Sequence, residues 1–100
     1  LAYMIESFAG VTEGAERMLD HMVLFATSDC SLGRTHDLAE YPVLLAGACN
    51  GKFPVGAHIA TSGSPNVSMV PYALASAFGT LDAWGTDDGR VTTTLTELGG

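Results

Sequence analysis

Hydrophobic side chains at the start of the chain recur with the spacing of an α-helix. They stand at positions i, i+3, i+4 and i+7, which line one face of a helix. The residues on this face are Leu1, Met4, Ile5 and Phe8. Gly10 interrupts the pattern, and residues 15–19 then predict a further short helical turn. The chain is therefore expected to open with a helix.

Two short apolar runs predict strands. Residues 22–26 read MVLFA, and residues 43–46 read VLLA directly after Pro42. Continuous apolar runs of this length are typical of strands covered on both faces in a parallel or mixed sheet. Pro42 fits this assignment because a missing N–H is tolerated at the first position of a strand. A third stretch, residues 57–60, predicts a short edge strand.

Helical spacing returns in the second half of the chain. The apolar positions with this spacing are Val67, Val70, Leu74 and Phe78. Asn66 or Ser68 is a suitable N-cap. Pro71 favours Ser68, because the proline then falls at position N3, where the N–H has no partner within the helix. Gly79 is predicted to end the helix, and an exposed loop and an irregular tail follow.

Helices combined with continuous apolar strands predict an α/β fold with a mixed or parallel sheet flanked by helices. The chain has 100 residues, of which 47% are hydrophobic and 15% charged, so many side chains must pack against something. We interpret residues 1–100 as one α/β segment, the carboxyl-terminal part of a longer chain. Its partner is then the rest of that chain or another protein. The alternative is a small independent domain that forms an oligomer.

Charge and hydropathy exclude two classes of partner. Four Lys and Arg residues against eleven Asp and Glu residues give a net charge of -7, so no basic surface is present to bind nucleic acid. Anionic membranes are excluded for the same reason. The longest apolar run, residues 22–26, is far below the roughly 20 residues that a membrane span requires.

The polar segment that follows the first predicted strand carries the main candidate chemistry. A loop of about a dozen residues, such as residues 29–41, is usually functional. It contains four residues of types that bind metals, namely Asp29, Cys30, His36 and Asp37. Ligands of open α/β sheets gather outside the carboxyl ends of strands, which is where Asp29 falls. The structural alternative is that Asp29 caps a turn and His36 binds loop backbone.

The cysteines and the other histidines support weaker hypotheses. Cys30 could act as a nucleophile activated by His36 or His58, but a small buried cysteine is the interpretation we favour. Cys30 and Cys49 could form a disulfide in an oxidising compartment, and the sequence does not decide whether they do. His21 lies at the entry to the first predicted strand, opposite Asp29, and is interpreted as structural.

The order of the segments adds a further pattern. It consists of MLDHMVL at residues 18–24, Ser28-Asp29, His36, YPVLLAG at residues 41–47, GKFPVGAH at residues 51–58 and, after a helix, WGTD at residues 84–87. This order resembles the carboxyl-terminal part of the HXXSHH family of bacterial proteins of unknown function. The resemblance implies a chain several hundred residues long that is exported, and therefore a secreted or periplasmic location.

The succession of strand, Ser-Asp, loop and His is also similar to the alkaline phosphatase and sulfatase superfamily, in which an S-D-H-G segment and a later histidine supply metal ligands. The resemblance implies that Asp29 and His36 bind a divalent metal, Zn, Mg or Mn. Cys30 stands where that superfamily has histidine, and Ser31 where it has glycine. The implied function is metal-dependent hydrolysis of phosphate or sulfate esters. The alternative is a non-catalytic structural or binding subunit that keeps the fold.

Overall fold

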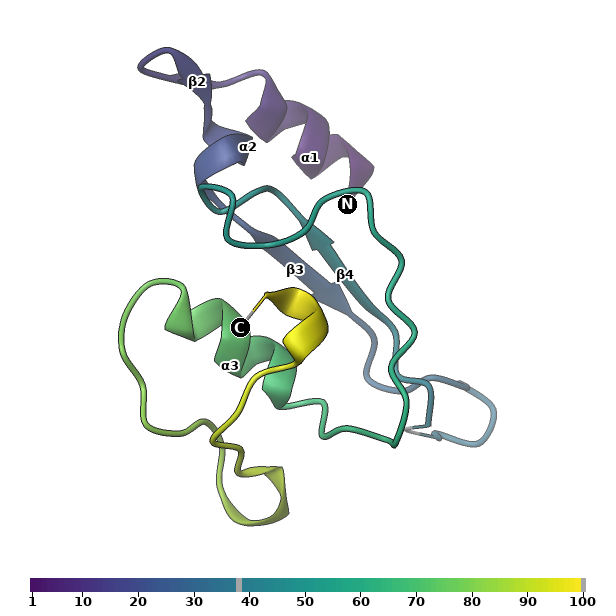
Figure 1. Cartoon of the computed structure of the whole chain (residues 1–100). Helices are drawn as coiled ribbons and strands as arrows, with labels where there is room; N and C mark the ends of the chain where they lie inside the picture. The colour runs from purple at the N-terminus through teal and green to yellow at the C-terminus, as the bar shows by residue number, and fades with distance from the viewer. Residues whose placement is uncertain (38, 100) are drawn as a thin grey trace. The chain divides into compact units, whose positions relative to one another are not determined.

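The computed structural model describes residues 1–37 and 39–99. It combines helices with two small antiparallel sheets, which confirms the α/β class (Figure 1). The chain divides into two compact units, Leu1–Gly51 and Lys52–Gly100. The interpretation of residues 1–100 as the carboxyl-terminal part of a longer chain stays a prediction.

The first unit opens with the helix predicted from the apolar spacing. Helix α1 spans Ala2–Ala9 and contains no proline or glycine. It ends at Gly10, whose backbone N–H donates to the carbonyl oxygen of Glu6 at 3.0 Å. Ile5 and Phe8 are partly buried, and α1 packs against the next helix, α2. The predicted helix is therefore confirmed.

A hairpin replaces much of the short helical turn expected at residues 15–19. Strand β1 spans Thr12–Glu13 and pairs antiparallel with β2, Glu16–Arg17. Gly14 lies between them with φ at 65°, a conformation that glycine adopts at little cost in a tight turn. The helical turn starts later, as α2 at Met18–His21. The prediction was right about the turn but misplaced its start.

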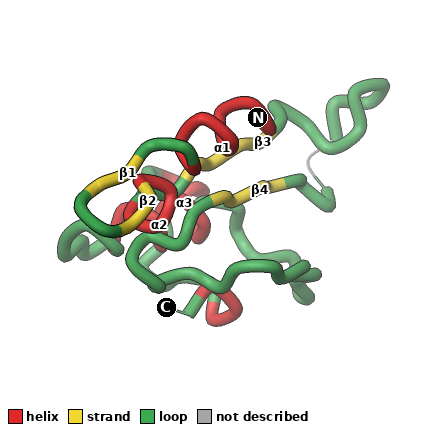
Figure 2. The backbone as a smooth tube through the Cα atoms, turned by 90° about the horizontal axis from the view of Figure 1, so that it is seen from above, coloured by secondary structure: helices red, strands yellow, loops and turns green. Residues whose placement is uncertain are grey.

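The second sheet of this unit contains both strands predicted from the apolar runs. Strand β3 spans Leu24–Thr27 and β4 spans Val43–Ala46. They lie side by side in antiparallel register from Leu24 opposite Ala46 to Thr27 opposite Val43 (Figure 2). No parallel pair occurs among the strands of the described residues. The helices and strands of this unit thus agree with an α/β segment, and a larger mixed or parallel sheet is a separate proposal.

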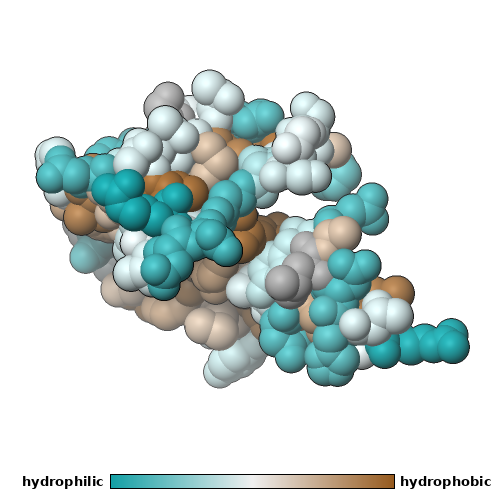
Figure 3. Space-filling view, turned by 90° about the horizontal axis from the view of Figure 1, so that it is seen from below, coloured by the Kyte–Doolittle hydropathy of each residue, from teal (hydrophilic) through white to brown (hydrophobic). Residues whose placement is uncertain are grey.

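Both faces of the β3–β4 sheet were predicted to be covered by other parts of the protein, but each face is partly exposed to solvent. Side chains alternate between faces along a strand, so Phe25 and Leu44 point to opposite sides. Their exposed fractions are 42% and 61%. Apolar groups also reach the surface on the side of the molecule drawn in Figure 3. Each face of the β3–β4 sheet therefore carries at least one large apolar side chain that water reaches.

The second unit is built around α3, which spans Met69–Ser76. Ser68 is its N-cap and Pro71 occupies N3, as predicted. Asn66 contributes as well, because its Oδ1 accepts the N–H of Ser68 at 3.0 Å and its Nδ2 donates to the carbonyl oxygen of Asp88 at 2.8 Å. The buried residues of this unit are Phe53, Val70, Tyr72, Ala73 and Leu98.

The rest of the second unit consists of loops with two short 3₁₀ turns, η1 at Asp87–Gly89 and η2 at Thr96–Leu98. The edge strand predicted at residues 57–60 is wrong, since these residues have no regular secondary structure. Gly56 precedes them with φ at 68°, which turns the chain away from an extended path. Within residues 1–37 and 39–99, no helix is long and apolar enough to cross a membrane.

Candidate functional site

The loop between β3 and β4, residues 28–42, holds the residues predicted to bind a metal. Two side chains join its ends. The hydroxyl of Tyr41 donates to the carbonyl oxygen of Ser28, and the Thr27 hydroxyl donates to the carbonyl oxygen of Pro42 at 2.7 Å. Each bond connects the segment leaving β3 with the segment entering β4. The base of the loop is therefore closed by side chains as well as by the strand pair.

A second closure lies further out on the same loop. The carbonyl oxygen of Asp37 accepts the backbone N–H of Ser31 at 2.7 Å and the Ser31 hydroxyl at 2.9 Å. Leu32 and Asp37 form an isolated antiparallel bridge. These contacts fold residues 33–36 into an exposed turn at the tip. The loop is thus a narrow, twice-closed projection, and Asp37 takes part in its framework through its backbone.

Asp29 lies just past the carboxyl end of β3, as predicted, and is exposed. Its Oδ1 accepts the Ser28 hydroxyl at 3.3 Å and the Cys30 thiol at 3.6 Å. The backbone N–H of Cys30 donates to the Ser28 hydroxyl at 3.5 Å. The structural alternative was that Asp29 caps this turn, but the Ser28 hydroxyl is the group that accepts the backbone N–H of Cys30. The Asp29 carboxylate is accessible from solvent.

His36 lies at the tip of the loop, beyond the closure between Ser31 and Asp37. It is exposed, and its φ of 51° places it in the left-handed region. Asp29 lies on the strand side of the same closure. Across the described ranges, no group of three or more His, Cys, Asp or Glu side chains comes close enough together to hold a metal ion. Asp29 and His36 share one loop, but the structure does not gather them with a third ligand.

Both cysteines are free and buried, with exposed fractions of 8% for Cys30 and 1% for Cys49. The disulfide left open by the sequence is not formed. The Cys30 thiol lies beside the Asp29 carboxylate, and no hydrogen bond joins it to a histidine in the part of the chain that is described. These contacts agree with the small buried cysteine that we favoured over a nucleophile.

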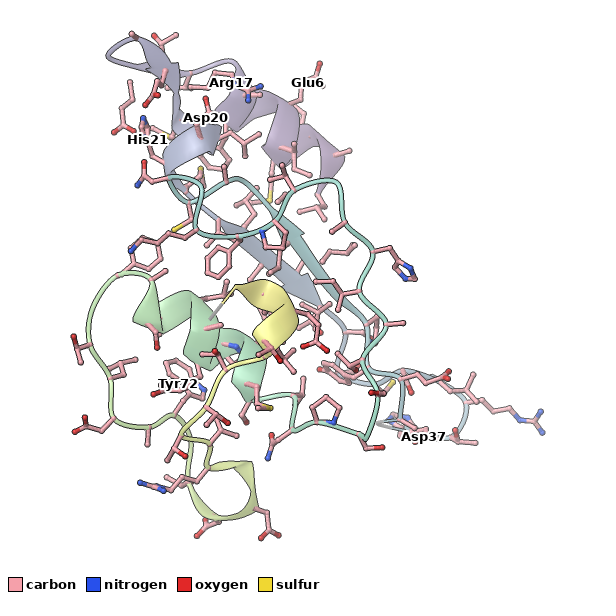
Figure 4. All side chains as sticks on the ribbon, in the orientation of Figure 1. Glu6, Arg17, Asp20, His21, Asp37 and Tyr72 are labelled. Atoms are coloured by element: carbon pink, nitrogen blue, oxygen red, sulfur yellow. The ribbon has the colours of Figure 1, made fainter. Side chains whose placement is uncertain are left out.

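The sequence provided no indication of a side-chain cluster at the other end of this sheet. His21 Nδ1 lies 2.5 Å from the Oδ1 of Asn50, and His21 Nε2 lies 3.1 Å from the Oε2 of Glu16. Figure 4 shows His21 and Asp20 at one end of the β3–β4 sheet and Asp37 at the other. Asn50 is 29 positions from His21 along the chain, so no local motif joins them.

Neighbouring side chains shift the pKa values of His21 and of the adjacent Asp20. The hydrogen bond to Asn50 raises the pKa of His21 above its ordinary value. Burial opposes this shift by a smaller amount, and the nearby carboxylate of Glu16 adds a still smaller upward effect. Arg17 and Asp20 form a separate ion pair with 2.7 Å between Nη2 and Oδ1. Hydrogen bonds from Arg17 hold the pKa of the Asp20 carboxyl below its usual value.

The second unit has an open cavity of about 540 Å³ next to the end of α3. Two polar groups on its wall already have backbone partners. Lys52 Nζ donates to the carbonyl oxygen of Ala77, and the Tyr72 hydroxyl donates to that of Leu81 at 2.8 Å. The fold therefore already uses these two groups as hydrogen-bond donors.

Comparison with known proteins does not extend these observations. Neither protein-family models, nor curated proteins, nor solved structures yielded a match to this chain.

Proposed function

We propose that this chain is the α/β carboxyl-terminal part of an exported protein that resembles the HXXSHH family and has an alkaline phosphatase-like mixed sheet. In this proposal Asp29 and His36 contribute to a divalent metal site that hydrolyses phosphate or sulfate esters. The observation that carries it is the exposed carboxylate of Asp29 directly beyond β3, on a twice-closed loop that also presents His36. Such loops, fixed at their ends by a sheet, are the usual places for catalytic residues.

The donor set is compatible with the metals of this superfamily. A carboxylate oxygen and an imidazole nitrogen suit Zn, Mg or Mn, but a metal site needs at least three protein ligands or additional waters. Asp29 and His36 supply two, so the remaining ligands belong to the rest of a longer chain or to a partner protein. A metal bound there would polarise a phosphoryl or sulfuryl oxygen. In this proposal the role of the present chain is to hold the Asp29 side chain at the end of β3.

Cys30 favours the second candidate, a non-catalytic structural or binding subunit. It stands where the superfamily has a histidine ligand, it is 8% exposed, and its thiol contacts Asp29. A buried thiol used in this way has to move before it can bind a metal. The exposed apolar residues on both faces of the β3–β4 sheet also suit a subunit whose role is to pack against other protein.

Metal content separates the two candidates. The purified protein is analysed by plasma mass spectrometry and titrated with Zn and Mn, beside Asp29→Asn and His36→Gln. Removing a ligand is expected to weaken binding by at least about tenfold. His58→Gln, which changes an exposed histidine of the other unit, is the matched control. If the wild type binds no metal, or both variants bind as much as it does, the metal site is wrong and the subunit is favoured.

A further inference from the structure

His21 lies between two acceptors that belong to different segments of the first unit. Glu16 comes from strand β2, and Asn50 comes from the turn after β4. The ring contacts both, Nδ1 to Asn50 Oδ1 at 2.5 Å and Nε2 to Glu16 Oε2 at 3.1 Å. A carboxylate and an amide oxygen only accept hydrogen bonds, so both ring nitrogens must carry protons for both contacts to exist. The geometry therefore matches the imidazolium form.

The backbone presents Asn50 to this ring whether or not the ring is charged. Three N–H groups of the turn donate to carbonyl oxygens in and just after α2: Ala48 to Leu19 at 3.2 Å, Cys49 to Met22 at 3.1 Å and Asn50 to Asp20 at 2.8 Å. None of these bonds involves a group that titrates. Glu16 has no comparable backbone tie to the turn within the described residues, so the ring of His21 is what connects the β1–β2 hairpin to it.

Charges around the ring also favour its protonated form. Glu13 on β1, Glu16 on β2 and Asp20 on α2 all attract a positive imidazolium. The cation nearest in sequence, Arg17, has its guanidinium bound to Asp20 through Nε and Nη2. Helix α1 packs against α2 and carries one charged residue, Glu6, which Figure 4 shows on the opposite side of α2 from His21.

We propose that His21 is a proton-dependent clasp that fastens the β1–β2 hairpin to the turn at residues 47–51. With both nitrogens protonated, the ring donates to Glu16 and Asn50 at once. When one proton leaves to solvent, the ring keeps one donor. The Asn50 amide can turn to offer an N–H to an unprotonated Nδ1, but the Glu16 carboxylate can only accept, so loss of the proton on Nε2 ends the contact with Glu16. The hairpin then loses its side-chain contact with the turn, while the bonds from Arg17 to Asp20 and the backbone bonds between the turn and α2 stay.

The direction of the pH response follows from the raised pKa of His21. A group whose pKa is higher in the folded chain stabilises the fold fully below its ordinary value, here 6.5. That contribution disappears as the pH rises through the folded pKa. The clasp is therefore closed in mildly acidic solution and open in alkaline solution. It lies at the end of the sheet away from Asp29 and His36 and does not depend on the proposed metal site.

Nitrogen-15 NMR of the His21 ring, recorded across pH 5 to 9 for the folded protein and again in urea, tests the clasp. The titration midpoint in the folded state is expected above that of the unfolded state, with both nitrogens protonated below it. Asn50→Leu and Glu16→Gln each lower the midpoint, whereas Asn50→Asp, which keeps an acceptor and adds charge, raises it. A folded midpoint at or below the unfolded one overturns the proposal, as does a midpoint that none of the three substitutions moves.

Hydrogen exchange shows whether the hairpin follows the proton. Amide protection of residues 12–17, corrected for intrinsic rates, is expected to fall as His21 loses its proton. His21→Gln is expected to remove this pH-dependent fall in protection (the pH step). His58→Gln, the control in the other unit, is expected to retain it. A pH step that survives His21→Gln overturns the clasp. Should His21→Gln fail to fold, loss of the step in Asn50→Leu supports the clasp and its persistence there contradicts it.

Discussion

At the scale of single residues, Gly47 has the most restricted position among the glycines of the first unit. Its φ is 107°, a conformation that residues with a side chain rarely adopt. A Cβ added there would lie 2.3 Å from the carbonyl oxygen of Met22 and 3.0 Å from that of Leu19. Those carbonyl groups accept hydrogen bonds from Cys49 and Ala48. Glycine therefore allows the turn after β4 to approach α2 closely enough for these bonds.

Gly47→Ala is expected to lower the free energy of unfolding by about 2 kcal/mol or more, because it combines an unfavourable φ with a backbone clash. Urea unfolding followed by circular dichroism measures this change. Gly33→Ala is the matched control, since nothing lies within 4 Å of an added Cβ there. The control is expected to change stability by less than about 1 kcal/mol. Equal effects of the two substitutions would contradict the close approach.

Asp20 predicts an acid-side loss of stability. Arg17 donates to its carboxylate from the backbone N at 3.0 Å and from the guanidinium, which lowers the pKa of Asp20 below its ordinary 3.8. A carboxyl whose pKa is lower in the folded state stabilises the fold above its ordinary value, and this contribution is lost as the pH falls through the folded pKa.

Asp20→Asn is expected to remove that acid-side component while leaving the slope above pH 5 unchanged. Thermal unfolding between pH 2 and 6 provides the measurement. Glu6→Gln, on the surface of α1, is the control that keeps the component. An Asp20→Asn protein with the same acid-side slope as the wild type would show that the contact with Arg17 contributes nothing to folding.

Sequence reasoning at this scale succeeded where the cause was local. Asp29 was placed beyond a strand because the apolar run before it is plain, and Cys30 was expected to be buried because small thiols usually are. The pairing of His21 with Asn50 was missed, since it depends on how the turn after β4 folds back onto α2. Contacts across 29 positions have no periodic signature.

At the scale of elements, a continuous apolar run and a proline near a helix start were reliable signals. The strand at residues 43–46 has the predicted bounds, and Pro71 identified the start of α3 correctly. The β1–β2 hairpin was missed because each strand has only two residues, too few for alternation to be visible. The strand expected at residues 57–60 was wrong for a different reason. Its four residues suit a strand, but the described part of the second unit has no partner strand with which they could pair.

The loop that carries Asp29 depends on its two closing side chains. Tyr41→Phe removes the donor to the Ser28 carbonyl, and Thr27→Val removes the donor to the Pro42 carbonyl. Each substitution is expected to cost about 1 kcal/mol, the usual net contribution of one hydrogen bond. Amide exchange of residues 28–37 should accelerate in both variants. Tyr3→Phe, at an 81% exposed position of α1, should leave the exchange of these amides unchanged.

At the scale of the whole molecule, large apolar side chains are exposed on more than one surface. Phe25 and Leu44 are exposed on opposite faces of the β3–β4 sheet. Single exposed apolar residues are common on soluble proteins, but a two-stranded sheet that is apolar on both faces has little to stabilise it alone. This distribution agrees with the proposal that further protein, from a longer chain or a partner, covers both faces.

If both faces are normally covered, the isolated 100-residue chain should bind the dye ANS and self-associate at high concentration. Phe25→Thr and Leu44→Thr keep strand propensity while removing apolar surface, so each should reduce dye binding and together they should reduce it most. Val55→Thr is the control, because Val55 is 70% exposed but belongs to the second unit. Fluorescence and sedimentation velocity measure the two properties. Because Phe25 and Leu44 lie on opposite faces, the effects of the two substitutions on dye binding should add. If Val55→Thr lowers dye binding as much as the double substitution does, the exposed faces of the β3–β4 sheet are not what binds the dye.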